Sequence, residues 1–368
     1  MKGSAKKDSM ESPRKNIALV APVPPPNGGM AMQAGKLAER LRAEGLSVSL
    51  IATNPDFPAA LKWCAALPGV RTFIRFWLYL FRLRALRSVD VVHIFACSHL
   101  YFFISVVPAL LVGRWFRCRV LVNYRGGEAD RFFARWGWLV GFYLKRVDAV
   151  VVPSPFLQEV FRQRLDIEAA VLPNIADAEL FAFRDRSVFE PVFVVSRQLE
   201  PIYGHEVILR AFARVRQELP AARLKIAGGG SLRQPLEEMV VREQIEGVEF
   251  YGTVDHQQLA EIYAASAVMV NASLADNFPG ALMEAFLCGL PVVTSDVGGI
   301  SCMVEHRRNG LLVKPHDDAA LAAGMLELVQ DPALARALAK EGYAYARQYR
   351  WEQIRERIFA LYFGDGAS

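Results

Sequence analysis

The chain is most informative between residues 271 and 293, which read Asn271-Ala-Ser-Leu-Ala-Asp-Asn-Phe-Pro-Gly-Ala-Leu-Met-Glu-Ala-Phe-Leu-Cys-Gly-Leu-Pro-Val-Val293. Apolar runs at 268–271 and 291–294 predict two strands, and residues 280–288 between them predict a helix. A strand, a helix and a second strand in this order are typical of a parallel sheet, whose strands need crossover connections. The segment therefore predicts an α/β domain around itself.

The same alternation extends in both directions along the chain. Nearby strands are predicted at 192–196, 223–227 and 248–251, with helices at 204–219, 232–244 and 255–266. An earlier set of strands is predicted at 16–21, 48–52, 89–95, 119–123, 149–152 and 169–172, with a helix at 30–44. The two sets predict two Rossmann-like, doubly wound domains that face each other across a cleft, where open α/β sheets bind ligands.

Composition shifts mark the boundaries of these domains. We predict one domain at 16–180 and another at 181–345, with the polar residues of 176–190 as a linker. Residues 1–15 are predicted to be a disordered tail, and no secretory signal is readable in them. The stretch 332–363 is predicted to be helical, and residues 346–368 are expected to form a C-terminal helix that crosses back to the first domain.

Composition also excludes several classes of protein. A length of 368 residues exceeds what one hydrophobic core usually fills, so two domains are expected. With 53% hydrophobic and 22% charged residues, the chain is neither disordered nor fibrous. Five cysteines without a Cys-x-x-Cys pair exclude a disulfide scaffold and a ribbon-type zinc site. They suit a reducing compartment, so a cytoplasmic location is expected.

Two carboxylates in the quoted stretch are candidate site residues. Asp276 lies in the loop before the predicted helix, and Glu284 lies about one turn inside it. Glu284 has apolar neighbours, and packing alone does not place a charge in such surroundings. A solvated helix face is the alternative, and the neighbours Met283 and Phe286 disfavour it.

Three more candidate loops follow predicted strands. Gly28 and Gly29 precede a helix, where backbone N–H groups can approach an anion; a simple tight turn explains them equally well. Arg197 ends a buried strand and can hold a phosphate bidentately, although an exposed salt bridge is an equal alternative. The glycines at 228–230 can touch a nucleotide, but Arg233 replaces the third glycine of a dinucleotide fingerprint, which disfavours an NAD-dependent dehydrogenase.

Taken together, these segments resemble the retaining glycosyltransferases of family 4, which have the GT-B fold of two facing Rossmann-like domains. The resemblance extends from about residue 16 to the C-terminal helix and rests on seven segments in the right order. They are the N-terminal Pro/Gly loop, residues 171–174, the Arg197 segment, residues 227–233, the two acids eight residues apart, residues 291–299 and residues 309–313.

The resemblance implies a role for each matching position, with an N-terminal acceptor domain and a C-terminal donor domain. Arg197 would pair with the donor diphosphate, Glu284 would hold the nucleotide ribose and Asp276 would contact the transferred sugar. The full donor-binding set is Gly29, Arg197, Tyr203, Gly228, Gly229, Gly280, Ala281, Leu282 and Glu284. Acceptor-side residues would be Gly28, Gly126 and Gly127, and Asp276 would be catalytic. Arg125 lies where the chain departs from the family, and we add it as a second candidate catalytic residue.

The chain also departs from the family pattern. Tyr203 stands where the family commonly has a Lys, and Asp276 stands where it usually has Glu. The family's His-containing segment after the fourth strand is missing at 123–128. We expect Arg125 or Arg233 to supply the missing cation for the donor diphosphate. Alternatively, the Tyr203 hydroxyl is sufficient in place of the Lys.

The implied activity is transfer of a sugar from a nucleoside diphosphate sugar to a hydroxyl with retained anomeric configuration, and the resemblance alone supplies the retention. The expected acceptor is a lipid-linked, envelope or exopolysaccharide glycan. No cofactor is expected, and no metal, because the chain has no Asp-x-Asp motif. Two alternatives stay open: a nucleotide-sugar epimerase of the same fold, and a degenerate protein that binds donor without turnover.

Residues 71–87 raise the question of a membrane. They place five Arg among large apolar residues, and residues 57–127 hold ten Lys and Arg against one acid, Asp90. This mixture suits a helix lying in an anionic headgroup layer, which would make the protein peripheral on the membrane. The alternative is a helix packed on its own sheet with its Arg side chains reaching outward. Nucleic acid is disfavoured, because long aliphatic runs accompany the basic residues.

Overall fold

The structure is a computed structural model that describes residues 15–24, 28–59, 63 and 67–364. Two predictions therefore lie outside the described residues: residues 1–14 of the tail, and residues 25–27 of the first Pro/Gly loop.

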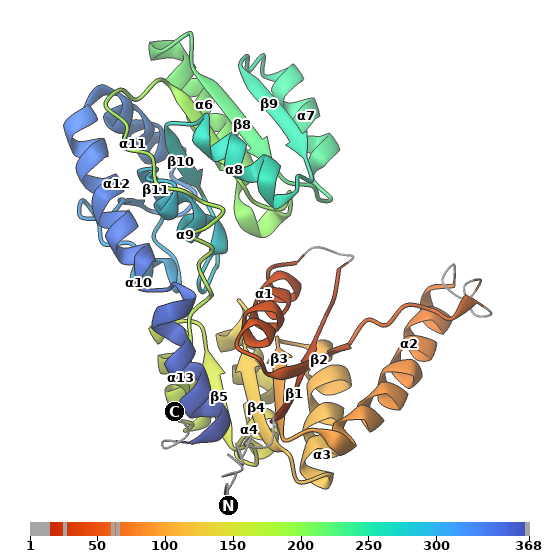
Figure 1. Cartoon of the computed structure of the whole chain (residues 1–368). Coiled ribbons are helices and arrows are strands. Elements are labelled where there is room, and N and C mark those ends of the chain that lie inside the picture. The colour runs from red at the N-terminus through yellow and green to blue at the C-terminus, as the bar shows by residue number, and fades with distance from the viewer. Residues whose placement is uncertain (1–14, 25–27, 60–62, 64–66, 365–368) are drawn as a thin grey trace, which may run out of the picture. The chain divides into compact units, whose positions relative to one another are not determined.

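The described strands form two parallel six-stranded sheets (Figure 1). The first has the order β2-β1-β3-β4-β5-β6 and the second the order β12-β11-β10-β7-β8-β9. The strands of the first sheet are β1 (Asn16–Ala21), β2 (Ser47–Ala52), β3 (Val91–Ala96), β4 (Arg119–Tyr124), β5 (Ala149–Val152) and β6 (Ala170–Val171). Those of the second are β7 (Val192–Val195), β8 (Arg223–Ala227), β9 (Val248–Gly252), β10 (Val268–Asn271), β11 (Val292–Ser295) and β12 (Leu311–Val313).

Helices alternate with the strands as crossovers, and the last three helices follow the last strand. In the first half they are α1 (Gly29–Ala43), α2 (Pro68–Arg82), η2 (Leu83–Ser88), η3 (Phe102–Val106), α3 (Val107–Trp115), α4 (Ala129–Leu144) and α5 (Pro155–Leu165). In the second half they are η4 (Pro201–Tyr203), α6 (His205–Glu218), α7 (Arg233–Arg242), α8 (His256–Ala264), α9 (Gly280–Leu287), α10 (Ile300–Met303), α11 (Asp318–Gln330), α12 (Pro332–Arg347) and α13 (Trp351–Phe363). The helical stretch predicted at 332–363 is thus two helices.

The strand orders confirm the doubly wound prediction and indicate where a ligand binds. Read from its other edge, the second sheet follows the sequence 3-2-1-4-5-6 of a Rossmann fold, with β7 and β10 as the central pair. Winding reverses between these two strands, and in the first sheet it reverses between β1 and β3. Ligands of open α/β sheets bind beyond the carboxyl ends of the strands at such a reversal. A ligand site is therefore expected at the loops after β7 and β10.

Local sequence explains why the central elements form. The strands β7 and β10 are buried on both faces and consist almost wholly of apolar residues, as expected in a parallel sheet covered by helices. The helix α8 begins with a capping box in which Asp255 and Gln258 satisfy each other's backbone N–H groups. Asp331 caps α12, whose first residue is Pro332.

The predicted linker at 176–190 lacks helix and strand, and parts of it are packed while the rest is exposed. Phe181 and Phe189 are buried. The Arg186 guanidinium donates to the carbonyl oxygens of Tyr263 (3.2 Å), Ser266 (3.1 Å), Cys288 (2.9 Å) and Gly289 (3.1 Å). Arg186 thus satisfies backbone acceptors at the C-terminal ends of α8 and α9, where a cation also meets the negative end of the helix dipole.

Arg186→Met is therefore expected to destabilise the protein, because it leaves several shielded carbonyl groups without a donor. We expect a loss of about 2–3 kcal/mol in the free energy of unfolding, measured by denaturant titration. Arg184→Met is the matched control, since the Arg184 side chain is exposed in the same segment. A loss of the same size in both variants would contradict the capping role.

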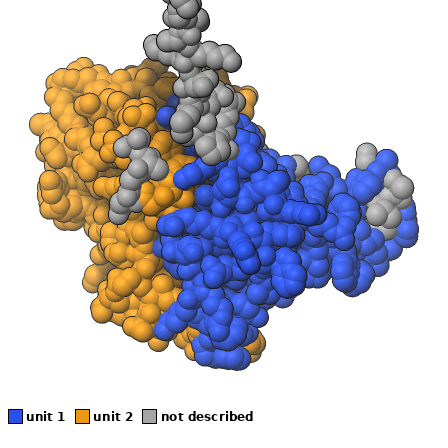
Figure 2. Space-filling model, turned by 60° about the horizontal axis from the view of Figure 1, so that its bottom comes forward, with its two compact units in different colours: residues 1–125, 138–151 blue, residues 126–137, 152–368 orange. Residues whose placement is uncertain are grey.

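The chain divides into two compact units (Figure 2). Unit 1 consists of residues 1–125 and 138–151, and unit 2 of residues 126–137 and 152–368. Unit 2 holds the second sheet and the candidate residues from Arg197 to Glu284, together with Gly126 and Gly127. Unit 1 holds Gly28, Gly29 and Arg125. The predicted domain boundaries and the placement of the C-terminal helix stay predictions.

Candidate active site

Two predicted site residues meet where the winding of the second sheet reverses. Arg197 follows β7, Asp276 lies in the loop after β10, and the two strands are hydrogen-bonded neighbours. Arg197 Nη2 forms an ion pair with Asp276 Oδ2, and the two side chains are only 12% and 16% exposed. Asp276 Oδ1 also accepts a hydrogen bond from the backbone N–H of Asn277 (2.8 Å). A diphosphate that binds Arg197 must therefore compete with Asp276 for the guanidinium.

Tyr203 supports this arginine through its ring. The Arg197 guanidinium carbon lies 4.1 Å from the centre of the Tyr203 ring, which is a cation–π contact. Tyr203 ends the short helix η4, and Gly204 follows with a φ of +64° and with its Cα close to the Ala272 carbonyl, where a Cβ would lie 2.2 Å from the oxygen. Tyr203 thus orients the Arg197 guanidinium through the face of its aromatic ring. The sequence did not suggest this role.

Arg197 retains donor capacity for a ligand. Among the described residues, its buried Nε–H has no hydrogen-bond partner. A buried donor without an acceptor is costly, so a phosphate oxygen reaching it would be favoured. The second candidate cation, Arg233, is engaged elsewhere: its Nε donates to Glu237, and its guanidinium lies 5.3 Å from the centre of the Phe250 ring.

The glycines at 228–230 allow the backbone to pack tightly beside Arg197. A Cβ on Gly228 would lie 2.0 Å from the Arg197 carbonyl oxygen, and one on Gly230 would lie 2.4 Å from that of Leu199. A Cβ on Gly229 would lie 2.5 Å from Thr253 Oγ1. The Leu199 N–H donates to the Gly229 carbonyl (2.9 Å). Packing against the backbone therefore requires Gly228 and Gly230, whereas the Thr253 side chain beside Gly229 can rotate. The role of the three glycines in holding a nucleotide stays a prediction.

Glu284 lies half-buried on α9, between the buried side chains of Met283 and Ala285. Its Oε2 lies 3.4 Å from the Tyr263 hydroxyl, which donates to it. Gly280 begins α9, and a Cβ on it would lie 3.9 Å from Glu284 Oε1. Ala281 and Leu282, also predicted to cradle the donor, are buried in the first turn of the helix, so their side chains pack inward.

Hydrogen bonds from Tyr263 connect the predicted carboxylate Glu284 to the segment that carries the predicted cation Arg197. The sequence did not indicate Tyr263 as a site residue. Its hydroxyl forms a hydrogen bond with Ser196, the residue before Arg197, and lies 3.3 Å from the Ala281 carbonyl. The side chain is fully buried, and burial raises the pKa of Tyr263 well above its usual value, so the hydroxyl keeps its proton. In the sequence, a Tyr within an amphipathic helix cannot be distinguished from an ordinary core residue.

Buried polar side chains form hydrogen bonds beside the loop that carries Asp276. Asn271 Nδ2 donates to Thr294 (2.9 Å), and Ser273 Oγ donates back to Asn271 Oδ1 (2.8 Å). From the side, the Gly299 N–H donates to the Asp276 carbonyl (2.9 Å), and a Cβ on Gly299 would lie 1.7 Å from the Asn277 carbonyl oxygen. A satisfied network of this kind fixes the loop in one conformation.

The two predicted acceptor-side glycines of unit 2 differ in environment. Gly126 is buried, and its carbonyl accepts from Asn277 Nδ2 (2.8 Å), so it contacts the loop that carries Asp276. Gly127 is exposed, and a Cβ on it would meet no described atom within 4 Å.

In unit 1, Arg125 follows the end of β4 beside a buried histidine. Its Nη1 lies 3.5 Å from Asn123 Oδ1, and Asn123 Nδ2 lies 3.0 Å from His93 Nε2. Burial lowers the pKa of Arg125 to about 10, and burial together with the Arg125 charge lowers the pKa of His93 to about 3. Arg125 is thus a cation and His93 is neutral at physiological pH.

Gly28 and Gly29 lie at the start of α1, beyond the carboxyl end of β1, where the first sheet reverses its winding. A Cβ on either would meet no described atom within 4 Å, so contacts within the described chain do not require glycine there. Their predicted contacts with the substrates stay predictions.

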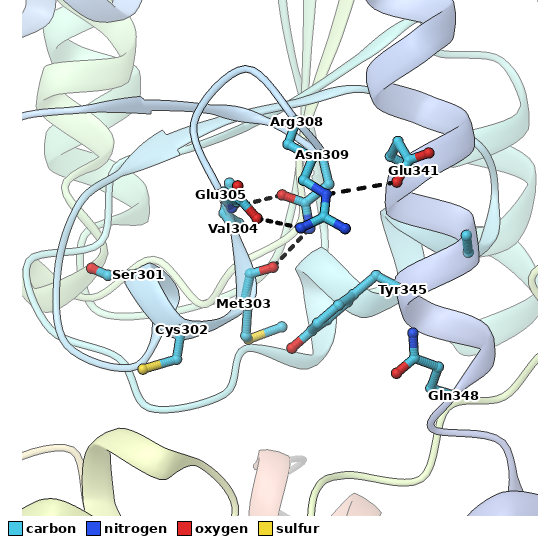
Figure 3. Close-up of a pocket in the computed structure, with 11 residues that line it drawn as sticks. Ser301, Cys302, Met303, Val304, Glu305, Arg308, Asn309, Glu341, Tyr345 and Gln348 are labelled. Carbon is cyan, nitrogen blue, oxygen red and sulfur yellow. Dashed lines mark hydrogen bonds and ion pairs between the residues drawn. The ribbon is translucent and has the colours of Figure 1, made fainter.

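A hollow of about 350 Å³ lies elsewhere in unit 2, lined by α10, the loop after it and α12 (Figure 3). Its charged residues satisfy one another: Arg308 pairs with Glu305 (2.6 Å) and approaches Glu341 (3.9 Å). None of its lining residues is a predicted donor residue. Within the described ranges, no three His, Cys, Asp or Glu side chains gather in a way that could hold a metal ion.

Comparison with known families gives two matches in tandem. The family described as Glycosyltransferase Family 4 matches residues 27–180, and the family described as Glycosyl transferases group 1 matches residues 179–345. Among relatives, a D-inositol 3-phosphate glycosyltransferase of Acidothermus cellulolyticus is 30% identical over 272 residues, which is 70% of this chain and 54% of that protein. The same enzyme of Segniliparus rotundus is 29% identical over 178 residues, 47% of this chain and 40% of that protein. The chain spans about half the length of these relatives.

Solved structures share the whole fold. A sucrose-phosphate synthase from Thermosynechococcus elongatus superposes with a TM-score of 0.78 at 23% identity, covering 95% of this chain and 98% of that one. HepE from Anabaena in complex with UDP superposes with a TM-score of 0.72 at 19% identity, covering 94% and 98%. At these identities the likeness shows the fold, and it confirms the predicted GT-B class.

Proposed function

Because this chain belongs to glycosyltransferase family 4 and has the GT-B fold, we propose that it transfers a hexose from a nucleoside diphosphate sugar to a hydroxyl group with retention of anomeric configuration. The acceptor we propose is a glycan, free or linked to a lipid. One observation carries the donor assignment: a shielded arginine with an unpartnered N–H lies where the second sheet reverses its winding. That HepE binds UDP on the same fold supports a nucleoside diphosphate.

Arg197 has the charge that such a donor needs. A cation at ~4 Å from a phosphate contributes roughly 4 kcal/mol at an effective dielectric constant of about 20. When the diphosphate takes the guanidinium, the carboxylate of Asp276 is released and becomes available to the sugar. The N-terminus of α9, beginning at Gly280, adds a positive dipole end.

The proposed reaction needs no reactant besides the donor and the acceptor. The acceptor oxygen forms a bond to the anomeric carbon while the bond from that carbon to the diphosphate oxygen breaks. The acceptor oxygen attacks the face of the sugar from which the diphosphate departs, which gives retention, and the acceptor proton passes to the leaving diphosphate. Arg197 stabilises the charge that develops on the leaving group. The proposal includes no divalent ion, and the chain's lack of an Asp-x-Asp motif supports this.

A donor panel tests the proposal. UDP-, GDP- and ADP-glucose are added at saturating concentration, and unfolding temperature and nucleoside diphosphate release are measured. One nucleotide is expected to raise the unfolding temperature by about 5–10 °C, since a ligand at a hundred times its Kd adds about 2.7 kcal/mol. The same nucleotide sugar should release nucleoside diphosphate, equally with and without EDTA.

Each rival predicts a different result in this panel. An epimerase converts the donor to its isomer without releasing nucleoside diphosphate, and a donor-binding protein shows the thermal shift alone. Nuclear magnetic resonance of the transferred product tests retention: the anomeric configuration of the donor is expected, and the inverted one would contradict the mechanism. Activity that disappears with EDTA would contradict metal independence.

A further inference from the structure

Helix α2 of unit 1 is apolar on two opposite faces. On one face Tyr79 is buried, and its hydroxyl donates to the Ser105 carbonyl, which fixes the helix to its own unit. On the other face Phe73, Trp77 and Phe81 are 64%, 56% and 63% exposed. These three residues are spaced by four, so they form one stripe along the helix. A folded domain seldom leaves a row of large aromatic side chains this exposed, so the stripe needs an explanation.

Arginines lie on the same helix and on the turn that follows it. Arg71, Arg82, Arg84 and Arg87 are exposed on α2 and η2. The Arg84 guanidinium lies 4.6 Å from the centre of the Phe81 ring, so cation and ring share one surface. Residues 57–127 hold a single acid, Asp90, and it accepts from the backbone N–H of Asn16 (2.7 Å). This part of unit 1 therefore combines exposed aromatic rings with several exposed arginines.

The helix also stands clear of the body of unit 1. Figures 1 and 2 both show this part of the unit as an arm that projects from the first sheet. The helix has 15 residues, and no helix in the described part of the chain is long and apolar enough to cross a bilayer. An exposed apolar stripe on a projecting cationic helix fits a surface that lies in the plane of the headgroups.

We propose that unit 1 docks on an anionic lipid membrane through α2 and η2. Phe73, Trp77 and Phe81 enter the boundary between headgroups and acyl chains, and the exposed arginines of α2 and η2 contact lipid phosphates. Charge complementarity selects this occupant: a second copy presenting the same face would bring like charges together. The inference does not depend on the proposed transfer activity.

Flotation with vesicles tests the inference on the full-length protein. Vesicles of phosphatidylglycerol and phosphatidylcholine are compared with phosphatidylcholine alone, at low and high salt. We expect binding to the anionic vesicles that weakens with salt. Removing three arginines (Arg71→Gln, Arg82→Gln and Arg87→Gln) should lower the partition coefficient about fivefold per charge. Removing the rings (Phe73→Ser, Trp77→Ser and Phe81→Ser) should lower it roughly tenfold per ring.

Matched controls change exposed residues of unit 2. The charge control is Arg223→Gln with Arg242→Gln and Arg357→Gln, and the apolar control is Val188→Ser with Val241→Ser. Both should bind vesicles like the unaltered protein, and all variants should keep its unfolding temperature. Equal binding to neutral and anionic vesicles at low salt, no binding to either, or equal losses in variants and controls would overturn the proposal. A concentration-dependent dimer that the ring variant abolishes would assign the stripe to a second copy instead.

Discussion

Arg197→Met is expected to lower kcat/KM for the donor by about a thousandfold and to destabilise the protein as well. The guanidinium pairs with Asp276 in the free protein and is proposed to pair with diphosphate during turnover. Its loss removes a charge-assisted contact to the leaving group and leaves the shielded carboxylate of Asp276 without a cation beside it. Steady-state kinetics with the cognate donor and denaturant unfolding measure the two effects separately.

A second substitution, added to Arg197→Met, separates the loss of activity from the loss of stability. Adding Asp276→Asn to Arg197→Met removes the unpaired carboxylate, so stability should largely return while activity stays low. Arg197→Lys keeps the charge but not the planar group that stacks on Tyr203, and an intermediate loss is expected. Arg233→Met is the control, because Arg233 is engaged with Glu237 and Phe250; its donor KM should change less than threefold. Donor kinetics left intact in Arg197→Met would remove this residue from the diphosphate site.

Much of the second domain could be predicted from residue patterns. The strands β8 (Arg223–Ala227) and β10 (Val268–Asn271) have the predicted bounds. In β8 the apolar residues alternate with Arg223 and Lys225 before the glycines at 228–230, and in β10 three apolar residues precede Asn271. The predicted linker lacks helix and strand and exposes most of its charged side chains, while Phe181 and Phe189 are buried. Arg186 looked like a surface charge in the sequence, whereas it donates to backbone carbonyls of four residues 77 to 103 positions away.

Contacts across the reversal point could not be predicted. Arg197 and Asp276 are 79 positions apart, and they meet only because β10 pairs with β7 and not with β9, the strand that precedes it in the chain. No local pattern specifies that choice. The sequence therefore assigned the two residues separate substrate contacts and missed that they form one ion pair. Tyr263 was missed for the same reason, since its hydrogen bonds to Ser196 and Glu284 join three different elements.

Glu284→Ala is expected to lower kcat/KM for the donor by about a hundredfold, and the loss should depend on the ribose. A carboxylate that accepts from two ribose hydroxyls contributes roughly 1.5–3 kcal/mol per hydrogen bond. The unaltered protein should therefore use a 2′,3′-dideoxy form of its nucleotide sugar about a hundredfold less well than the ribose form. Glu284→Ala should treat the two donors almost equally, which a residue that only packs α9 would not produce.

Tyr263→Phe tests how the carboxylate is oriented. The substitution removes the hydroxyl 3.4 Å from Glu284 Oε2 and keeps the ring that fills the core. We expect a loss of about tenfold in kcat/KM for the ribose donor, carried mainly by KM, and a weaker preference for ribose over dideoxyribose. Tyr345→Phe is the control, a shielded tyrosine on α12 that lines the separate hollow of Figure 3. If Tyr263→Phe keeps the full ribose preference, Glu284 is held by α9 alone; if Glu284→Ala also keeps it, the ribose binds elsewhere.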